Sequence, residues 1–143
     1  MIAAVCVFSA AVCASADSEE AIYDFAAQSY ADGDYELAVI EFTRFVFLHP
    51  EAPRAPKAAF FAAMSYFRMS RYDRAIESFE ALIDQYPDSD EAVEARFISA
   101  RCYLKTNQGD SAIRSIQNIL KMNISPETRD RAYYSIGWIA LES

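Results

Sequence analysis

The sequence predicts an all-α protein folded as a right-handed α-solenoid of helix–turn–helix repeats. Its composition favours helices, because 143 residues include only 3 glycines and 5 prolines, while hydrophobic residues make up 53% and can bury a core. The chain also repeats itself at a fixed period, and the apolar residues within each period have helical spacing. Together these observations predict about three and a half repeats and seven helices.

The period is 37 residues. The segment that starts at Tyr35 recurs from Tyr72 and, more weakly, from Gly109, so that each step is 37 residues (72 − 35 and 109 − 72). Small residues recur at the same step, at Ala26, Ala63, Ala100 and Gly137. Because a small residue lets two helix backbones approach closely, we expect each unit to be a tightly packed helix pair.

Helix boundaries follow from the breaks in each unit. In the first unit Ala38, Phe42 and Phe45 have the i, i+4, i+7 spacing of one helix face. The pairs are interrupted at 32–34, 70–71 and 107–109, and prolines separate the units. The expected helices are 19–32, 35–48, 56–69, 72–85, 91–106, 109–122 and 127–142. The corresponding repeats are about 19–55, 56–92, 93–129 and a partial unit, 130–143.

The last expected helix matches the first helix of a fourth unit, and little of its circumference is polar. Terminal helices of a solenoid normally have a polar outer face. We therefore expect this helix to have neighbours on both sides, either in a longer repeat array of which this chain is the N-terminal part or through self-association.

Residues 1–16 differ from the rest, because they carry no charged side chain and the first charge is Asp17. This apolar stretch ends in Ala14-Ser15-Ala16, the small-x-small pattern of a signal-peptidase site. An uncleaved anchor is the alternative, but 16 residues fall short of the roughly 20 that span a bilayer. We therefore interpret 1–16 as a signal peptide and 17–143 as the repeat domain. Cys102 is then the sole cysteine of the mature chain.

The composition also excludes several kinds of chemistry. A net charge of -8 disfavours nucleic acid as a partner. His49 is the only histidine, no cluster has metal-ligand spacing, and the three glycines form no phosphate loop. The acidic runs 17–20 and 88–91 precede helices, where they suit capping better than catalysis. We expect no enzyme activity, no cofactor, no metal and no small-molecule substrate.

The second unit reads Ala62-Ala63-x2-Tyr66, then Ala75-x3-Phe79, then Pro87. This resembles the tetratricopeptide repeat (TPR) pattern W-x2-L-G-x2-Y, A-x3-F, P. The longer period and the Tyr-Pro-Asp-Ser link are similar to TPR proteins of bacterial envelopes, of the Tol-Pal-associated periplasmic coordinator and outer-membrane assembly lipoprotein types. That resemblance implies export across the inner membrane to the periplasm, and only indirect contact with membranes.

Two rows of large side chains recur on the first helix of each unit. Tyr23, Phe60, Phe97 and Tyr134 share one repeated position, and Tyr30, Phe67, Leu104 and Leu141 lie seven residues further on, about two turns along the same face. The alternative interpretation is that both rows pack successive units together. The predicted partner-binding residues are Tyr23, Tyr30, Phe60, Met64, Phe67, Arg68, Phe97, Arg101, Lys105, Tyr134 and Trp138.

These residues suit a protein or peptide partner, as an amphipathic or extended segment with some negative charge. The sequence therefore predicts a non-catalytic interaction scaffold of the cell envelope with a concave groove. The alternatives are a self-association module that forms homo-oligomers, and an N-terminal fragment of a larger repeat protein in an envelope assembly or secretion complex.

Overall fold

The computed structural model describes residues 18–142, and the expected signal peptide lies outside them. All regular structure in this part of the chain is helical, which confirms the all-α repeat fold. The helices are α2 (Glu19–Ala31), α3 (Tyr35–Leu48), α4 (Ala55–Arg68), α5 (Tyr72–Gln85), α6 (Asp90–Lys105), α7 (Gly109–Leu120) and α8 (Pro126–Glu142). Each lies within two residues of its expected bounds, the largest difference being the end of α7.

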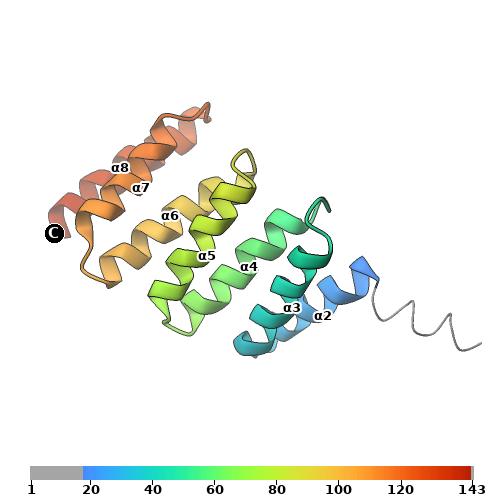
Figure 1. Ribbon diagram of the computed structural model, residues 1–143. Coiled ribbons are helices and arrows are strands. Elements are labelled where there is room, and N and C mark those ends of the chain that lie inside the picture. Colours follow the sequence, from blue (N-terminus) through green and yellow to red (C-terminus); the bar gives the residue numbers. More distant parts are fainter. Residues whose placement is uncertain (1–17, 143) are drawn as a thin grey trace, which may run out of the picture.

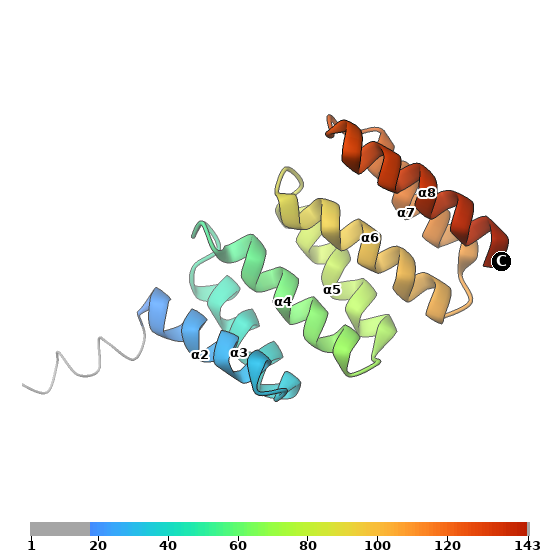
Figure 2. The same cartoon turned by 180° about the vertical axis from the view of Figure 1, so that it is seen from behind.

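The helices form two layers (Figures 1 and 2). The first helices α2, α4, α6 and α8 lie side by side in one layer, and the second helices α3, α5 and α7 lie in the other. Each helix packs against the next one along the chain, and α4 also contacts α2 and α6. The first helices therefore form a continuous wall of their own.

Local signals start these helices where the sequence indicates. The Ser18 hydroxyl accepts a hydrogen bond from the Ala21 N–H at the start of α2, and Ser89 does the same for Ala92 at the start of α6. Acidic residues occupy the first turns of both helices. Because carboxylates there face the positive end of the helix dipole, Glu19, Glu20, Asp90 and Glu91 stabilise these two helix starts.

The turn within each pair depends on one residue in the left-handed region. These residues are Gly33, Ser70 and Asn107, with φ of 83°, 59° and 58°, and they are 37 positions apart (70 − 33 and 107 − 70). Only glycine adopts this conformation without steric cost. The period thus extends to the backbone geometry of the turns.

Alanines lie where paired helices cross. Ala26 and Ala38 of the first pair are fully buried, as are Ala63 and Ala75 of the second. Phe42, Phe79 and Ile116 fill the space beside these crossings and are also fully buried. A larger side chain at the crossing would force the helices apart. The alanines therefore determine how deeply the large apolar side chains beside them are buried.

Large apolar side chains remain exposed on α8. Leu141 is 87% exposed and Tyr134 77%, although Ala132 and Ile139 of the same helix are buried against the third unit. Tyr134 occupies the repeat position of Tyr23 and Phe97, which the second helix of their own unit helps to cover. The apolar circumference expected for this helix is therefore present.

We predict that Ser70→Gly stabilises the fold by about 1 kcal/mol, because glycine removes the cost of the left-handed conformation. The Ser70 side chain contributes only a long, exposed contact with the Tyr72 hydroxyl, at 3.5 Å. Gly33→Ser should destabilise by a similar amount. Urea unfolding monitored by circular dichroism measures both changes.

Ser78→Gly, within α5, is the matched control and should destabilise by about 0.5 kcal/mol. If Ser70→Gly and Ser78→Gly both destabilise, the assignment of a shared left-handed turn is wrong.

Candidate protein-interaction groove

The wall of first helices carries the predicted binding residues. In this layer equivalent residues of consecutive units lie next to each other, as the 37-residue spacing between Glu94 and Arg131 shows. Each first helix therefore adds one strip of side chains to the same surface. A ligand that crosses the wall meets these strips in succession.

The first aromatic row lies mostly in the core. Tyr23 is 9% exposed, and its ring packs edge-on against Phe42 and Phe45 at centroid distances of 5.7 and 5.4 Å. Phe97 is 5% exposed, and the half-buried Phe60 packs 5.7 Å from Phe79. These three side chains pack mainly against the second helices of their own units. Little of Tyr23 and Phe97 therefore remains exposed for contact with a partner.

The second row is intermediate. Tyr30 packs 5.0 Å from Phe61 of the following unit, and Phe67 packs 5.7 Å from Tyr72. Both rings are half-buried, as is Met64 between the rows. Each therefore combines packing between helices with a surface that remains open on the wall.

Arginines cover these rings from the next unit or linker. The Arg101 guanidinium lies 5.3 Å above the Phe67 ring, and Arg131 lies 3.9 Å above Phe97. Arg54 covers Tyr23 at 4.9 Å. Arg68 instead interacts with the Tyr30 hydroxyl, and this hydrogen bond raises the pKa of Arg68. The wall thus presents cations stacked on aromatic rings.

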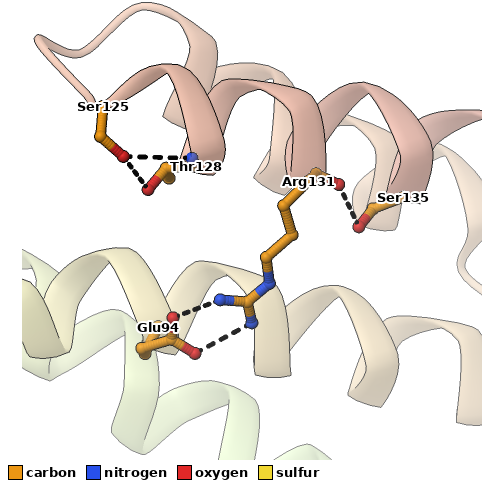
Figure 3. A network of polar contacts seen from close by, with 5 residues as sticks. All are labelled: Glu94, Ser125, Thr128, Arg131 and Ser135. Atoms are coloured by element: carbon orange, nitrogen blue, oxygen red, sulfur yellow. Dashed lines mark hydrogen bonds and ion pairs between the residues drawn. The ribbon is translucent and has the colours of Figure 1, made fainter.

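Arg131, which the sequence analysis missed, holds α8 against α6 (Figure 3). Its two guanidinium nitrogens donate to the two carboxylate oxygens of Glu94, with 3.0 Å between Nη2 and Oε2. The hydrogen bond to Glu94 raises the pKa of Arg131. Because the two residues are 37 positions apart, the repeat period was the signal that could have predicted this contact. An exposed ion pair adds at most about 1 kcal/mol, but it orients the cation above Phe97.

Charge divides the wall into two edges. Arg68 and Lys105 lie in the last turns of α4 and α6, and the exposed Arg101 lies one turn before Lys105. Acidic residues lie in the first turns of α2, α6 and α8, at Glu19, Glu20, Asp90, Glu91 and Glu127. Since the first helices share one direction, these basic residues follow one edge of the wall and the acidic residues the other, except that α4 begins with Arg54 and Lys57 in place of acidic residues.

Two of the hollows along this wall contain predicted binding residues. The one between α6 and α8 has a volume of about 240 Å³ and brings together the predicted residues Phe97, Arg101 and Trp138 with Leu104 and Arg131. The other, about 230 Å³, includes Phe60 with Lys57 and Glu94 between α4 and α6. The remaining predicted residues line neither hollow: Tyr23, Tyr30, Met64, Phe67, Arg68, Lys105 and Tyr134.

Within residues 18–142, no group of three or more histidine, cysteine or carboxylate side chains could hold a metal ion. In the same part of the chain, no helix has the length and apolarity needed to cross a bilayer. Cys102 is a free, fully buried thiol.

The sequence profile of the tetratricopeptide repeat matches residues 23–90 and 62–120, which together span more than half of the chain. The chain belongs to the tetratricopeptide repeat family. No curated protein sequence matches it significantly.

Several solved structures share the fold at low identity. The Yersinia enterocolitica type III secretion chaperone SycD, in complex with a peptide of the translocator YopD, has a TM-score of 0.70 and 20% identity, over 86% of this chain and 92% of that one. The CopN-Scc3 complex matches with a TM-score of 0.67 and 18% identity, over 83% and 67% of the two chains. A MamA RS-1 mutant matches with a TM-score of 0.68 and 16% identity, over 88% and 66%.

We predict that stability falls at alkaline pH through Cys102. Burial raises the pKa of this thiol from 9.0 to about 11. The buried neutral thiol therefore contributes fully to the free energy of unfolding below pH 9, and this contribution is lost as the pH rises towards 11. About two pKa units correspond to at most roughly 2–3 kcal/mol. Urea unfolding of the wild type and Cys102→Ala at several pH values measures the difference.

The other ionisable groups are common to both proteins, so their effects on stability cancel in the comparison. Equal loss of stability in the two proteins between pH 9 and 11 would contradict a buried, neutral thiol.

Proposed function

We propose that this protein is a non-catalytic scaffold of the bacterial cell envelope that binds a segment of another protein along the wall of first helices. The observation that carries the proposal is the combination of half-buried aromatic rings, cations stacked on them and two edges of opposite charge on one surface. Such a surface offers anchoring pockets in the middle and charges at the rim.

The ligand chemistry follows from this layout. The middle of the wall suits apolar side chains, which would contact Phe67 and Trp138, the latter 45% exposed. Acidic residues on one side of the ligand would face Arg68, Arg101 and Lys105. Basic residues on its other side would face the carboxylates of the first turns. Charges at the rim mainly orient the ligand and speed its association, whereas the apolar contacts supply most of the affinity.

The comparisons support this class of function at the level of the fold. A structural neighbour, SycD, was solved with a peptide of YopD, and another neighbour is part of the CopN-Scc3 complex.

Self-association is the second candidate, and the exposed apolar side chains of α8 favour it. SycD has also been solved as an alternative dimer. Size-exclusion chromatography coupled to light scattering distinguishes the two functions. A protein that stays monomeric at high concentration does not self-associate, which would rule out the second candidate.

The sole tryptophan gives a direct binding assay, because Trp138 lines the hollow between α6 and α8. We predict that peptides selected on the native protein from a random displayed library shift Trp138 emission. Arg101→Glu should weaken their binding by about tenfold or more, since it removes a cation from the wall and reverses its charge.

Arg74→Glu, at an exposed site on α5, is the matched control with the same change in net charge and should leave binding unchanged. Binding that is lost equally in both variants, or retained in both, would contradict recognition by the wall. Circular dichroism of each variant confirms that it is folded.

We also propose export from the cytoplasm, on the strength of the apolar segment 1–16. Expression of the whole chain in a Gram-negative host should yield a periplasmic protein whose first residue is Asp17, because the peptidase cleaves after Ala16. Mass spectrometry of the cell fractions measures this, with Ala14→Arg as the unprocessed control. Accumulation of the uncleaved chain in the cytoplasm would contradict the proposal.

A further inference from the structure

A polar cleft of about 550 Å³ lies among α5, α6 and α7, apart from the hollows of the first-helix wall. Its lining includes Glu80 and Asp84 of α5, Arg96 and Ser99 of α6, and Arg114 of α7. A cleft of this volume accepts a small polar group or one side chain of a larger partner.

The cleft exists because the third unit departs from its own repeat pattern. In the pattern W-x2-L-G-x2-Y, Arg96 takes the place of the tryptophan and Ser99 that of the leucine, as the following Ala100 and Tyr103 show. The second unit has Ala59 and Ala62 at these places. Ala59 and Ala62 are part of the apolar core, so an arginine and a serine at the equivalent places of the third unit make this contact polar.

Arg96 is a half-buried cation without a carboxylate partner. Its Nη1 donates to the Ala92 carbonyl at 3.0 Å, and no ion pair forms on it among residues 18–142. Burial lowers the pKa of Arg96, and the nearby charge of Asp84 only partly offsets this effect. A partly desolvated guanidinium favours an added anion.

The Ser99 hydroxyl also lacks a partner. The side chain is 2% exposed, and its Oγ makes no hydrogen bond within the structure. The other buried serines differ, because Ser29 and Ser65 donate to the carbonyls of Phe25 and Phe61 one turn earlier. Ser99 therefore offers its hydroxyl to the cleft that it lines.

The acidic residues of the cleft do not fill this role. Glu80 already accepts a hydrogen bond from the Tyr103 hydroxyl. Together with burial, this bond raises the pKa of Tyr103 to about 12. On the other side, Nη2 of Arg114 donates only to the neutral Ser111 hydroxyl, at 3.0 Å. Among the described residues, therefore, neither the Arg96 nor the Arg114 guanidinium is paired with a carboxylate in this cleft.

We propose that this cleft binds a carboxylate group, held by Arg96 and Arg114 with the Ser99 hydroxyl as a further donor. The carboxylate can belong to an acidic side chain of a protein partner or to a small free dicarboxylic acid. The site is separate from the first-helix wall, so the two surfaces can be occupied together.

The experiment is an NMR titration of the full chain with two probes, glutarate and a capped peptide of glycine and glutamate residues. Either probe should shift the Arg96 and Arg114 side-chain signals. Arg96→Leu combined with Ser99→Leu, which restores apolar residues at both places, should weaken binding by about tenfold or more and raise the midpoint of thermal unfolding. Binding of the peptide alone assigns the site to a protein side chain, and binding of glutarate alone assigns it to a free acid.

Arg96→Gln is a second, milder variant, for use if the double variant does not fold. It keeps a polar side chain but removes the positive charge, so it should also weaken binding of both probes. Arg74→Leu is the matched control and should bind both probes as the wild type does. The proposal is overturned if neither probe shifts the Arg96 signals, or if Arg96→Gln binds them as tightly as the wild type.

Discussion

The close approach of paired helices at alanine residues is the constraint on which the rest of this structure depends. Where Ala63 meets Ala75 the backbones are near enough for Phe79 to be wholly enclosed, and the same geometry recurs in the other pairs. A single pair cannot cover its own apolar faces, so units must stack. Stacking places all first helices in one layer and thereby creates the wall that carries the aromatic and cationic side chains.

The fold could be predicted from the sequence because its determinants are local and periodic. The alanines, the apolar spacing and the interruptions of the pattern all recur at 37 residues, and even the left-handed turn residues obey the period. The exposed residues of the candidate site were harder to predict from the sequence. Position on the wall follows from the period, but exposure depends on whether a neighbouring helix or an arginine covers the ring. Tyr23 and Phe97 share a repeat position with the exposed Tyr134, and only their surroundings distinguish them. Sequence spacing carries no such information.

The two candidate sites use opposite departures from an ideal repeat. On the wall, large aromatic rings lie where a solvated surface would carry polar side chains, and arginines shield them by stacking. In the cleft, Arg96 and Ser99 lie where the repeat normally buries apolar side chains. Both departures cost stability in the isolated chain, which a partner bound at the proposed sites would recover.

The central claim is that a partner lies along the first helices. Paramagnetic relaxation from a spin label on a selected peptide tests it most directly, because signal loss reports proximity without requiring substitution of the wall. The account predicts broadening at Met64, Arg101 and Trp138, on three consecutive first helices, while exposed residues of α5 and α7 such as Arg74 and Gln117 stay sharp. Broadening confined to α3, α5 and α7 would contradict it.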